Sequence, residues 1–198
     1  MRVLVLGASG TIGRAVVAAL RTEHDVLGVA HRSGQLTVDL GDPHSIRELL
    51  REAGTMDAIV CAAGAAKFAP LARLSDRDFE FSLTNKLMGQ VNLVRYGFAH
   101  LHDGGSFTLT SGLLARSPMA GGAAISLVNA ALEGFVRAAA LEAPRGIRVN
   151  AVSPGFVSET LAAMGKDGEA GTPAATVARS YVESVTGTMT GEVLEPRR

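Results

Sequence analysis

The chain has 198 residues, a formal net charge of zero, 47% hydrophobic residues and no tryptophan. This length and apolar content predict one folded domain spanning residues 1–198, and the balanced charge argues against a nucleic-acid partner, which would require a basic patch. The single cysteine, Cys61, excludes an internal disulfide framework and favours a reducing cytoplasm, and no apolar run is long enough to predict a membrane span or a signal peptide.

Short β-branched runs alternate with longer helical patterns along the whole chain. This alternation predicts an α/β fold, in which crossover helices cover both faces of a parallel sheet. The expected strands are residues 3–6, 26–30, 58–61, 106–110, 147–152 and a short one within 187–194. The expected helices are residues 12–21, 43–53 after an Asp42 cap, a long one from Ser75 to about Leu101, 123–142 and 173–185.

Glycine-rich or mixed stretches separate these elements. Gly104 and Gly105 are expected to break the long helix, and residues 64–74 and 112–122 are expected to be loops. Residues 159–172 predict a mobile loop with at most one helical turn. The helix at 123–142 is apolar nearly all round, which predicts a buried helix, and a subunit interface is one way to bury it.

The first strand opens directly into Gly7-Ala8-Ser9-Gly10-Thr11-Ile12-Gly13, ahead of the first helix. In such a turn Gly7 permits the tight bend, Gly10 lets the backbone approach a pyrophosphate, and Gly13 lets the helix pack on the strand. The helix N-terminus adds N–H groups for an anion. We therefore place a dinucleotide pyrophosphate here, with a tight turn lacking any ligand as the alternative. The residues assigned to it are Gly7, Ser9, Gly10, Thr11, Ile12 and Gly13.

The second strand ends in Ala30-His31-Arg32-Ser33, without the acidic residue that an NAD site uses for the ribose 2′-hydroxyl. Arg32 and Ser33 offer a cation and a hydroxyl where a 2′-phosphate would lie, and His31 stands beside them. This pattern favours NADP(H) over NAD(H). The alternative is an exposed arginine on a loop.

Four further segments resemble the short-chain dehydrogenase/reductase superfamily, and the likeness covers nearly the whole chain. They are Asp39-Leu40, the run from Asp57 to Gly64, the run from Arg148 to Gly155, and Thr190-Gly191-Glu192-Val193-Leu194. The resemblance implies a doubly wound, Rossmann-type sheet with strand order 3-2-1-4-5-6-7 and a ligand cleft at the carboxyl ends of the strands. It also implies further cofactor contacts at Asp39, Leu40, Ala62, Ala63, Gly64, Pro154 and Gly155.

The same resemblance implies a catalytic Tyr-x-x-x-Lys, but this chain has Ile125 and Asn129 at those positions. Ser111 is the candidate for the family's catalytic serine, although the usual register falls on Gly112; a hydroxyl that caps the strand end is the alternative. Lys86 occupies the family's asparagine position. Its ammonium could replace the missing lysine and donate a proton after burial lowers its pKa. A structural role for Lys86 is the alternative, and Asn85 replaces it if the register slips by one residue.

Three functions remain open. The first is an NADP(H)-dependent oxidoreductase that acts on a small carbonyl or alcohol, with Lys86, Ser111 or an ordered water as proton donor. The second is a catalytically inactive NADP(H)-binding sensor or regulatory protein, and the third is an isomerase or dehydratase. The helix at 123–142 resembles the family's main interface helix, which implies a homodimer or homotetramer. The sequence shows no metal-ligand spacing and no serine-hydrolase motif.

Overall fold

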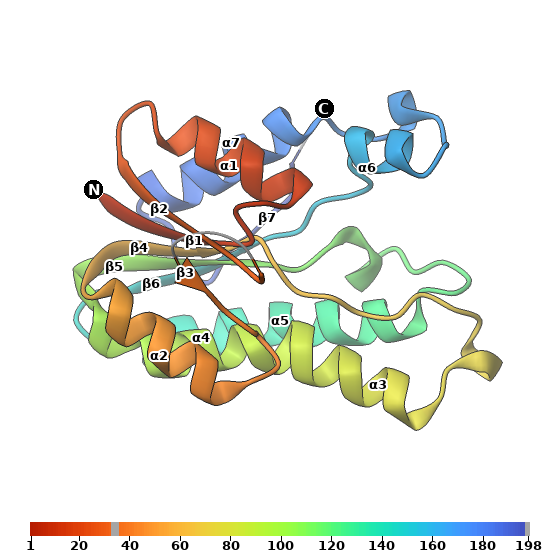
Figure 1. The fold of residues 1–198 in the computed structure, drawn as a ribbon, viewed down its shortest axis with the longest axis horizontal. Helices are drawn as coiled ribbons and strands as arrows, with labels where there is room; N and C mark the ends of the chain where they lie inside the picture. Colours follow the sequence, from red (N-terminus) through yellow and green to blue (C-terminus); the bar gives the residue numbers. More distant parts are fainter. Residues whose placement is uncertain (33–35, 197–198) are drawn as a thin grey trace.

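A seven-stranded parallel sheet forms the centre of the computed structural model, which describes residues 1–32 and 36–196 (Figure 1). The strand order β3-β2-β1-β4-β5-β6-β7 is the order that the resemblance implied. All neighbouring strands run parallel. The strands are β1 (Arg2–Leu6), β2 (Asp25–Ala30), β3 (Leu36–Thr37), β4 (Met56–Cys61), β5 (Leu101–Thr110), β6 (Arg148–Val152) and β7 (Val193–Leu194).

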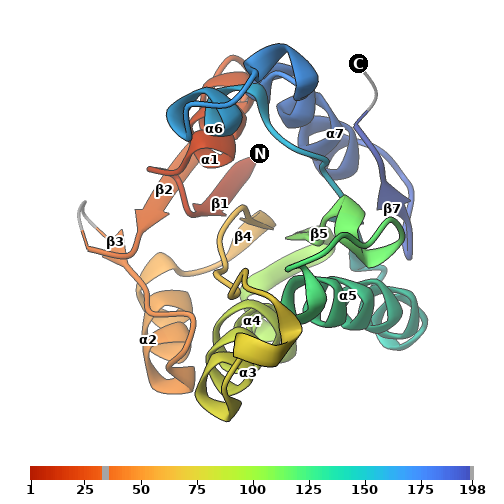
Figure 2. The same ribbon diagram turned by 90° about the vertical axis from the view of Figure 1, so that its right-hand side faces the viewer.

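Helices cover both faces of this sheet. Helices α1 (Thr11–Leu20) and α7 (Ala174–Thr186) lie on one face, and α2 (Pro43–Ala53), α4 (Gly89–Gly97) and α5 (Ala123–Glu142) lie on the other (Figure 2). Alternation along the strands supplies a core to each layer, because successive side chains point to opposite faces. In β1, for example, the side chains of Val3 and Val5 belong to the core that α1 and α7 cover. Those of Leu4 and Leu6 belong to the core on the opposite face, which α2, α4 and α5 cover.

The register of the central strands creates the site. Leu6 at the end of β1 pairs with Val29 of β2 on one side and with Cys61 of β4 on the other. The turns that follow these strands therefore meet at one edge of the sheet, where the chain order reverses between β1 and β4. Ligands of open α/β sheets bind at such a switch point.

Two predicted helix starts are confirmed. Asp42 caps α2, and its Oδ1 accepts a hydrogen bond from the His44 N–H at 2.8 Å. Ser75 and Asp78 form a complete capping box at the start of α3 (Asp76–Ser82). Each cap satisfies backbone donors that the first helical turn leaves without a partner.

The long helix predicted from Ser75 to about Leu101 is divided in the structure. It consists of α3, a π-helical turn η2 (Leu83–Met88), α4 and a short 3₁₀ turn η3 (Phe98–His100), so its end agrees with the prediction. The expected break at Gly104 and Gly105 is wrong, because β5 begins at Leu101 and includes both glycines. Gly104 adopts a φ of 75° and donates its N–H to the Arg145 carbonyl. The two glycines therefore lie at an irregularity within β5, where its register against β4 shifts.

The sequence pattern did not predict β3, which has only two residues. The segment expected as a glycine-rich loop contains α6 (Ser158–Ala163) and a 3₁₀ turn η5 (Gly168–Ala170). Its two ends are joined, since the Ser158 N–H donates to the Thr172 carbonyl at 3.0 Å. The other 3₁₀ turns are η1 (Leu71–Arg73) and η4 (Leu113–Ala115).

Helix α5 has the predicted bounds, but only one of its faces is buried. That face packs on β6 and η4, whereas Leu127 is 46% exposed and Leu141 is 90% exposed. Within the described ranges it is the one helix long and apolar enough to span a membrane by length and composition alone, a test that core helices also pass. Among the described residues the outer apolar face of α5 has no partner, so complete burial of this helix would require a subunit interface, which stays a prediction.

Candidate active site

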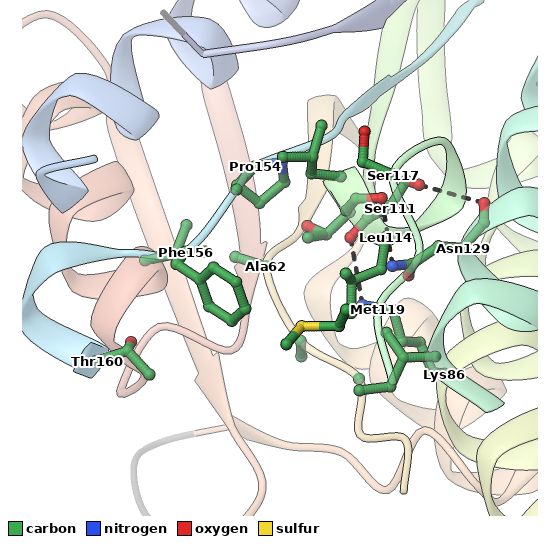
Figure 3. Close-up of a pocket in the computed structure, with 18 residues that line it drawn as sticks. Ala62, Lys86, Ser111, Leu114, Ser117, Met119, Asn129, Pro154, Phe156 and Thr160 are labelled. Carbon is green, nitrogen blue, oxygen red and sulfur yellow. Dashed lines mark hydrogen bonds between the residues drawn. The ribbon is translucent and has the colours of Figure 1, made fainter. Parts of the chain in front are cut away.

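Two cavities lie along the carboxyl ends of the strands, and together they form a trough. The cavity on the β2 side measures about 500 Å³, and the one on the β5 and β6 side about 550 Å³. Both are lined by Ala62, Ala63 and Gly64, which follow β4, so they meet above the switch point. Figure 3 shows the second cavity, which we call the cleft.

The glycine turn has the close packing that the sequence predicted. Gly7 adopts a φ of 82°, and a Cβ on it would lie 2.7 Å from the Ala62 carbonyl oxygen. A Cβ on Gly13 would lie 1.9 Å from the Gly7 carbonyl oxygen. Gly10 caps α1 without a side-chain hydrogen bond, and Ser9 and Gly10 are exposed at the trough. First-turn N–H groups have no intrahelical partner, so this turn can hold an anion.

The end of β2 lies at the first cavity, as expected for a 2′-phosphate site. His31 and Arg32 are exposed and line this cavity. The His31 Nδ1–H donates to the Val38 carbonyl at 3.2 Å, which fixes the ring beside the trough. No ion pair within residues 1–32 and 36–196 involves Arg32. Ser33 lies outside the described residues.

The two residues expected against the adenine differ in placement. Leu40 is buried and lines the first cavity. Asp39 is exposed, and its Oδ1 accepts a hydrogen bond from the Gly41 N–H at 2.8 Å. Asn85, the alternative to Lys86, lines the same cavity and accepts from the Ala65 N–H at 2.8 Å.

The π-helical turn η2 places Lys86 at the floor of the cleft (Figure 3). The Lys86 Nζ donates to the Ser111 carbonyl at 3.3 Å. Burial lowers the pKa of Lys86 from its ordinary value near 10.5 to about 8, because water no longer solvates the charged form fully. Single π-helical turns within α-helices occur frequently at functional sites. No pattern in the sequence predicted this π-helical turn.

Gln90 is a residue of this site that sequence reasoning missed. It is fully buried, and its amide pairs with Thr110 at the end of β5, accepting from the Thr110 N–H at 2.8 Å and donating to the Thr110 carbonyl at 3.0 Å. Its Nε2 also donates to the Lys86 carbonyl at 3.1 Å. Gln90 thus ties the π-helical turn to the strand. The sequence carried no clear signal for Gln90, because the same helix also contains the polar residues Asn92 and Arg95.

Asn129 lies on the opposite wall of the cleft. It is 2% exposed, and its Nδ2 donates to the Gly112 carbonyl at 3.4 Å. Its Oδ1 is a buried acceptor without a partner in the part of the chain that the structure describes. Ile125 lies one helical turn earlier and lines the same cleft. The two residues that the resemblance assigned to the Tyr and Lys positions therefore both line the cleft, and isoleucine cannot donate a proton.

Ser111 is buried at the end of β5, and its hydroxyl faces α5. The Ser111 Oγ donates either to the Asn129 carbonyl at 3.2 Å or to Glu133 Oε1 at 3.1 Å. Glu133 is 4% exposed, and its Oε1 also accepts from the Ser153 hydroxyl at 3.3 Å. Its Oε2 accepts from Arg116 Nε at 3.0 Å. Sequence reasoning missed Glu133, whose signal is a carboxylate on the apolar helix one turn after Asn129.

The two tyrosines of the chain lie elsewhere. Tyr181 is buried under the sheet, where its hydroxyl contacts Thr110 Oγ1 at 2.6 Å and burial raises its pKa. Tyr96 packs against the guanidinium of Arg47 on α2. Neither tyrosine can replace the missing proton donor from its present position.

Cys61 is fully buried at the end of β4, and burial raises the pKa of its thiol to about 11.

A doubly wound parallel sheet with a glycine turn at its switch point defines a dinucleotide-binding domain of the Rossmann type. Residues 7–190 match the family model described as Enoyl-(Acyl carrier protein) reductase. The chain belongs to this family, within the short-chain dehydrogenase/reductase superfamily.

Similar proteins of known structure cover the whole chain. The crystal structure of the protein lin1944 from Listeria innocua is 40% identical, covers 100% of both chains and has a TM-score of 0.95. A small-chain dehydrogenase in complex with NADPH is 27% identical, with 98% of this chain and 95% of that chain covered and a TM-score of 0.87.

A curated relative, hydroxynaphthalene reductase arp2 from Aspergillus fumigatus, is 32% identical over 117 residues. This match covers 59% of the present chain and 43% of the relative. The chain thus aligns with less than half the length of that reductase.

Proposed function

We propose that this protein is an NADP(H)-dependent oxidoreductase that transfers hydride to or from a small carbonyl or alcohol, with Lys86 as the proton donor. The observation that carries this proposal is the placement of the Lys86 ammonium on the floor of the cleft, hydrogen-bonded to the end of β5. The resemblance places the family's catalytic serine at this strand end.

The trough fits NADP(H) in shape and charge. Gly7, Gly10 and Gly13 leave room where any Cβ would contact backbone, and α1 begins at that point. Arg32 is a free cation at the 2′-phosphate position within the described ranges, and a structural neighbour is in complex with NADPH. His31, Asp39, Leu40, Ala62, Ala63, Gly64, Pro154 and Gly155 are the remaining proposed cofactor residues, with Ser33 outside the described ranges. The cofactor would supply the hydride.

The chain's own residues would then handle the proton. With a pKa of about 8, Lys86 is mostly an ammonium at neutral pH and can donate a proton to a substrate oxygen. Above pH 8 the neutral amine can accept a proton in the reverse reaction. Ser111 directs its own proton toward α5, so we assign its hydroxyl oxygen the role of accepting a hydrogen bond from a substrate alcohol.

Asn129 would position the cofactor. Its Oδ1 is buried without a partner and lines the cleft, and an unpaired buried acceptor is costly. A ribose hydroxyl would satisfy it. The family's lysine holds the ribose at this position.

The walls of the cleft favour an apolar substrate. Leu113, Leu114, Met119, Ile125 and Phe156 line the cleft together with Lys86. A small aldehyde, ketone or alcohol with an apolar body would bury its hydrocarbon part against these side chains and direct its oxygen to the ammonium. We further propose that the protein acts in the cytoplasm as a homodimer or homotetramer that buries the outer face of α5.

The test is a titration with NADPH and NADH, followed by a panel of small carbonyl substrates. We expect NADPH to bind and turnover to fall by about 10²–10⁴-fold in Lys86→Ala, the usual contribution of a general acid. Lys67→Ala is the matched control, because Lys67 is exposed and pairs with Asp78 away from the cleft. Failure of both nucleotides to bind would refute the cofactor assignment.

A second candidate is an NADP(H)-binding sensor or regulatory protein without turnover. Ile125 favours it, because an isoleucine at the family's tyrosine position cannot donate a proton. NADPH binding without turnover on any carbonyl or alcohol, together with unchanged binding in Lys86→Ala, would favour this candidate over the oxidoreductase.

A further inference from the structure

Lys86 is a half-buried charged group with few partners. Its Nζ makes one hydrogen bond, to the Ser111 carbonyl, although an ammonium can donate three. No carboxylate pairs with it in residues 1–32 and 36–196. The titratable group that acts on it from β4 is Cys61, whose thiol stays neutral near pH 7 because its pKa is raised to about 11. The buried carboxylate of α5, Glu133, is engaged by Arg116 and two serine hydroxyls.

The other two lysines of the chain differ in environment. The side chain of Lys67 is 51% exposed, pairs with Asp78 at 4.0 Å and lies over the ring of Phe81. Lys166 is exposed near the end of α6. Lys86 alone of the three lines the cleft. At pH 7 a pKa of about 8 leaves about one tenth of its side chains as the neutral amine, which is the nucleophilic form.

The cleft provides space and an apolar environment for a reaction at this amine. It measures about 550 Å³, a size in the range of small-molecule sites. The apolar side chains of Ile125, Met119 and Phe156 line it together with Lys86, and Figure 3 shows Met119 and Phe156 pointing into the cleft. A lysine amine kept in an apolar pocket is activated toward carbonyl compounds, because desolvation disfavours its protonated form.

We propose that Lys86 is a covalent capture site, at which its amine forms a reversible imine with small apolar aldehydes and ketones that enter the cleft. The Nζ lone pair attacks the carbonyl carbon, and one N–H proton passes to the oxygen to give a carbinolamine. A proton from solvent then lets the hydroxyl group leave as water, and the C=N bond forms with a positive charge on nitrogen. Hydrolysis reverses every step, so the reaction needs no oxidant or reductant.

This inference does not rest on NADP(H) or on turnover. It requires only that a carbonyl compound reaches the floor of the cleft and that a neutral amine is present there. Proton donation by the ammonium and capture by the amine use different protonation states of the same nitrogen. Both states are populated near neutral pH.

The experiment traps the imine in the full-length protein without any nucleotide. Benzaldehyde and sodium cyanoborohydride are added at pH 7, and labelled lysines are identified by peptide mass spectrometry over time. We expect Lys86 to be labelled at least about 10-fold faster than Lys67 and Lys166, and its labelling rate to rise with pH to a plateau above about 8. The comparison among three lysines of one protein needs no variant.

Lys86→Arg supplies the control, since arginine keeps the cation but forms no imine under these conditions. We expect the fast label to disappear while the slow labelling of Lys67 and Lys166 continues, with an unchanged circular dichroism spectrum. Labelling of Lys86 at or below the rate of the two exposed lysines would overturn the inference. A protein that fails every turnover assay but labels rapidly at Lys86 would refute the proposed oxidoreductase and leave the capture site standing.

Discussion

Lys86 and Asn129 hold neighbouring carbonyl groups at the end of β5. The Lys86 Nζ donates to the Ser111 carbonyl at 3.3 Å, and the Asn129 Nδ2 donates to the Gly112 carbonyl at 3.4 Å. The two side chains come from different elements, η2 and α5. In the pattern that the family resemblance implies, the amide stands at position 86 and the ammonium at position 129. On that alignment the two groups are exchanged in this chain, and one of each contacts the strand end.

The pH profile of turnover should report the titration of Lys86. Because burial lowers its pKa to about 8, carbonyl reduction should decline as the pH rises through 8, where the ammonium is lost, and alcohol oxidation should increase over the same interval. Lys86→Arg stays protonated and should remove this inflection in whatever activity persists. Initial rates between pH 6 and 10 in both directions test this. An inflection near 8 that persists in Lys86→Arg would assign it to another group.

Replacing Lys86 with methionine should stabilise the fold. The folded-state pKa lies below the unfolded value, so the unfolded chain binds more protons between about pH 8 and 10.5, and wild-type stability rises with pH across that interval. Lys86→Met removes this penalty and should raise the free energy of unfolding at pH 7 by about 1–3 kcal/mol. Urea denaturation at pH 7 and pH 10 measures both effects. A variant less stable than wild type would show that the Ser111 contact outweighs the desolvation of the ammonium.

Removal of Glu133 should destabilise the site and the fold together. Glu133→Ala leaves Ser111, Ser153 and Arg116 without their shared acceptor, and should lower the free energy of unfolding by about 2–5 kcal/mol. Chemical denaturation provides the measurement. Glu142→Ala, at the exposed end of the same helix, should change stability by less than about 0.5 kcal/mol. Equal losses in the two variants would contradict the role given to Glu133.

Arg32 should determine the preference for NADP(H). Arg32→Ala loses a charge-assisted contact to the 2′-phosphate, so we expect NADPH affinity to fall by about 10–100-fold while NADH affinity stays within about twofold. Fluorescence titration of both nucleotides measures the ratio. Arg51→Ala on α2 is the control, because Arg51 is exposed and pairs with its neighbour Glu52. A parallel loss for NADPH and NADH would mean that Arg32 does not read the phosphate.

The outer face of α5 should mediate self-association. Leu127 and Leu141 are exposed large apolar side chains on this helix, and burial of each in an interface would contribute about 1–3 kcal/mol. We expect light scattering to show a dimer or tetramer for the wild type and a monomer for Leu127→Asp, which places a charge in the interface. A monomeric wild type at micromolar concentration would remove the basis for this prediction.

Some features followed from local sequence alone. The glycine turn after β1 needs only three residues at fixed spacing, and the caps at Asp42 and Ser75 depend on side chains that bond their own backbone. The residues in each of these interactions are only a few positions apart, so the interactions can be predicted from the sequence alone. The absence of Tyr and Lys at positions 125 and 129 was equally plain.

The direction of each proposed catalytic side chain depended on tertiary structure. Lys86 reaches the cleft because a π-helical turn, tied to β5 by Gln90, shifts the helical phase at that residue. The Ser111 hydroxyl turns toward α5 because Glu133, 22 residues later in the chain, accepts it there. The sequence by itself determined the alternation of strands and helices and the glycine turn, which arise from local periodicity and spacing. Only the packed structure decided where the remaining polar groups point, because buried hydrogen bonds between distant segments fix their orientation.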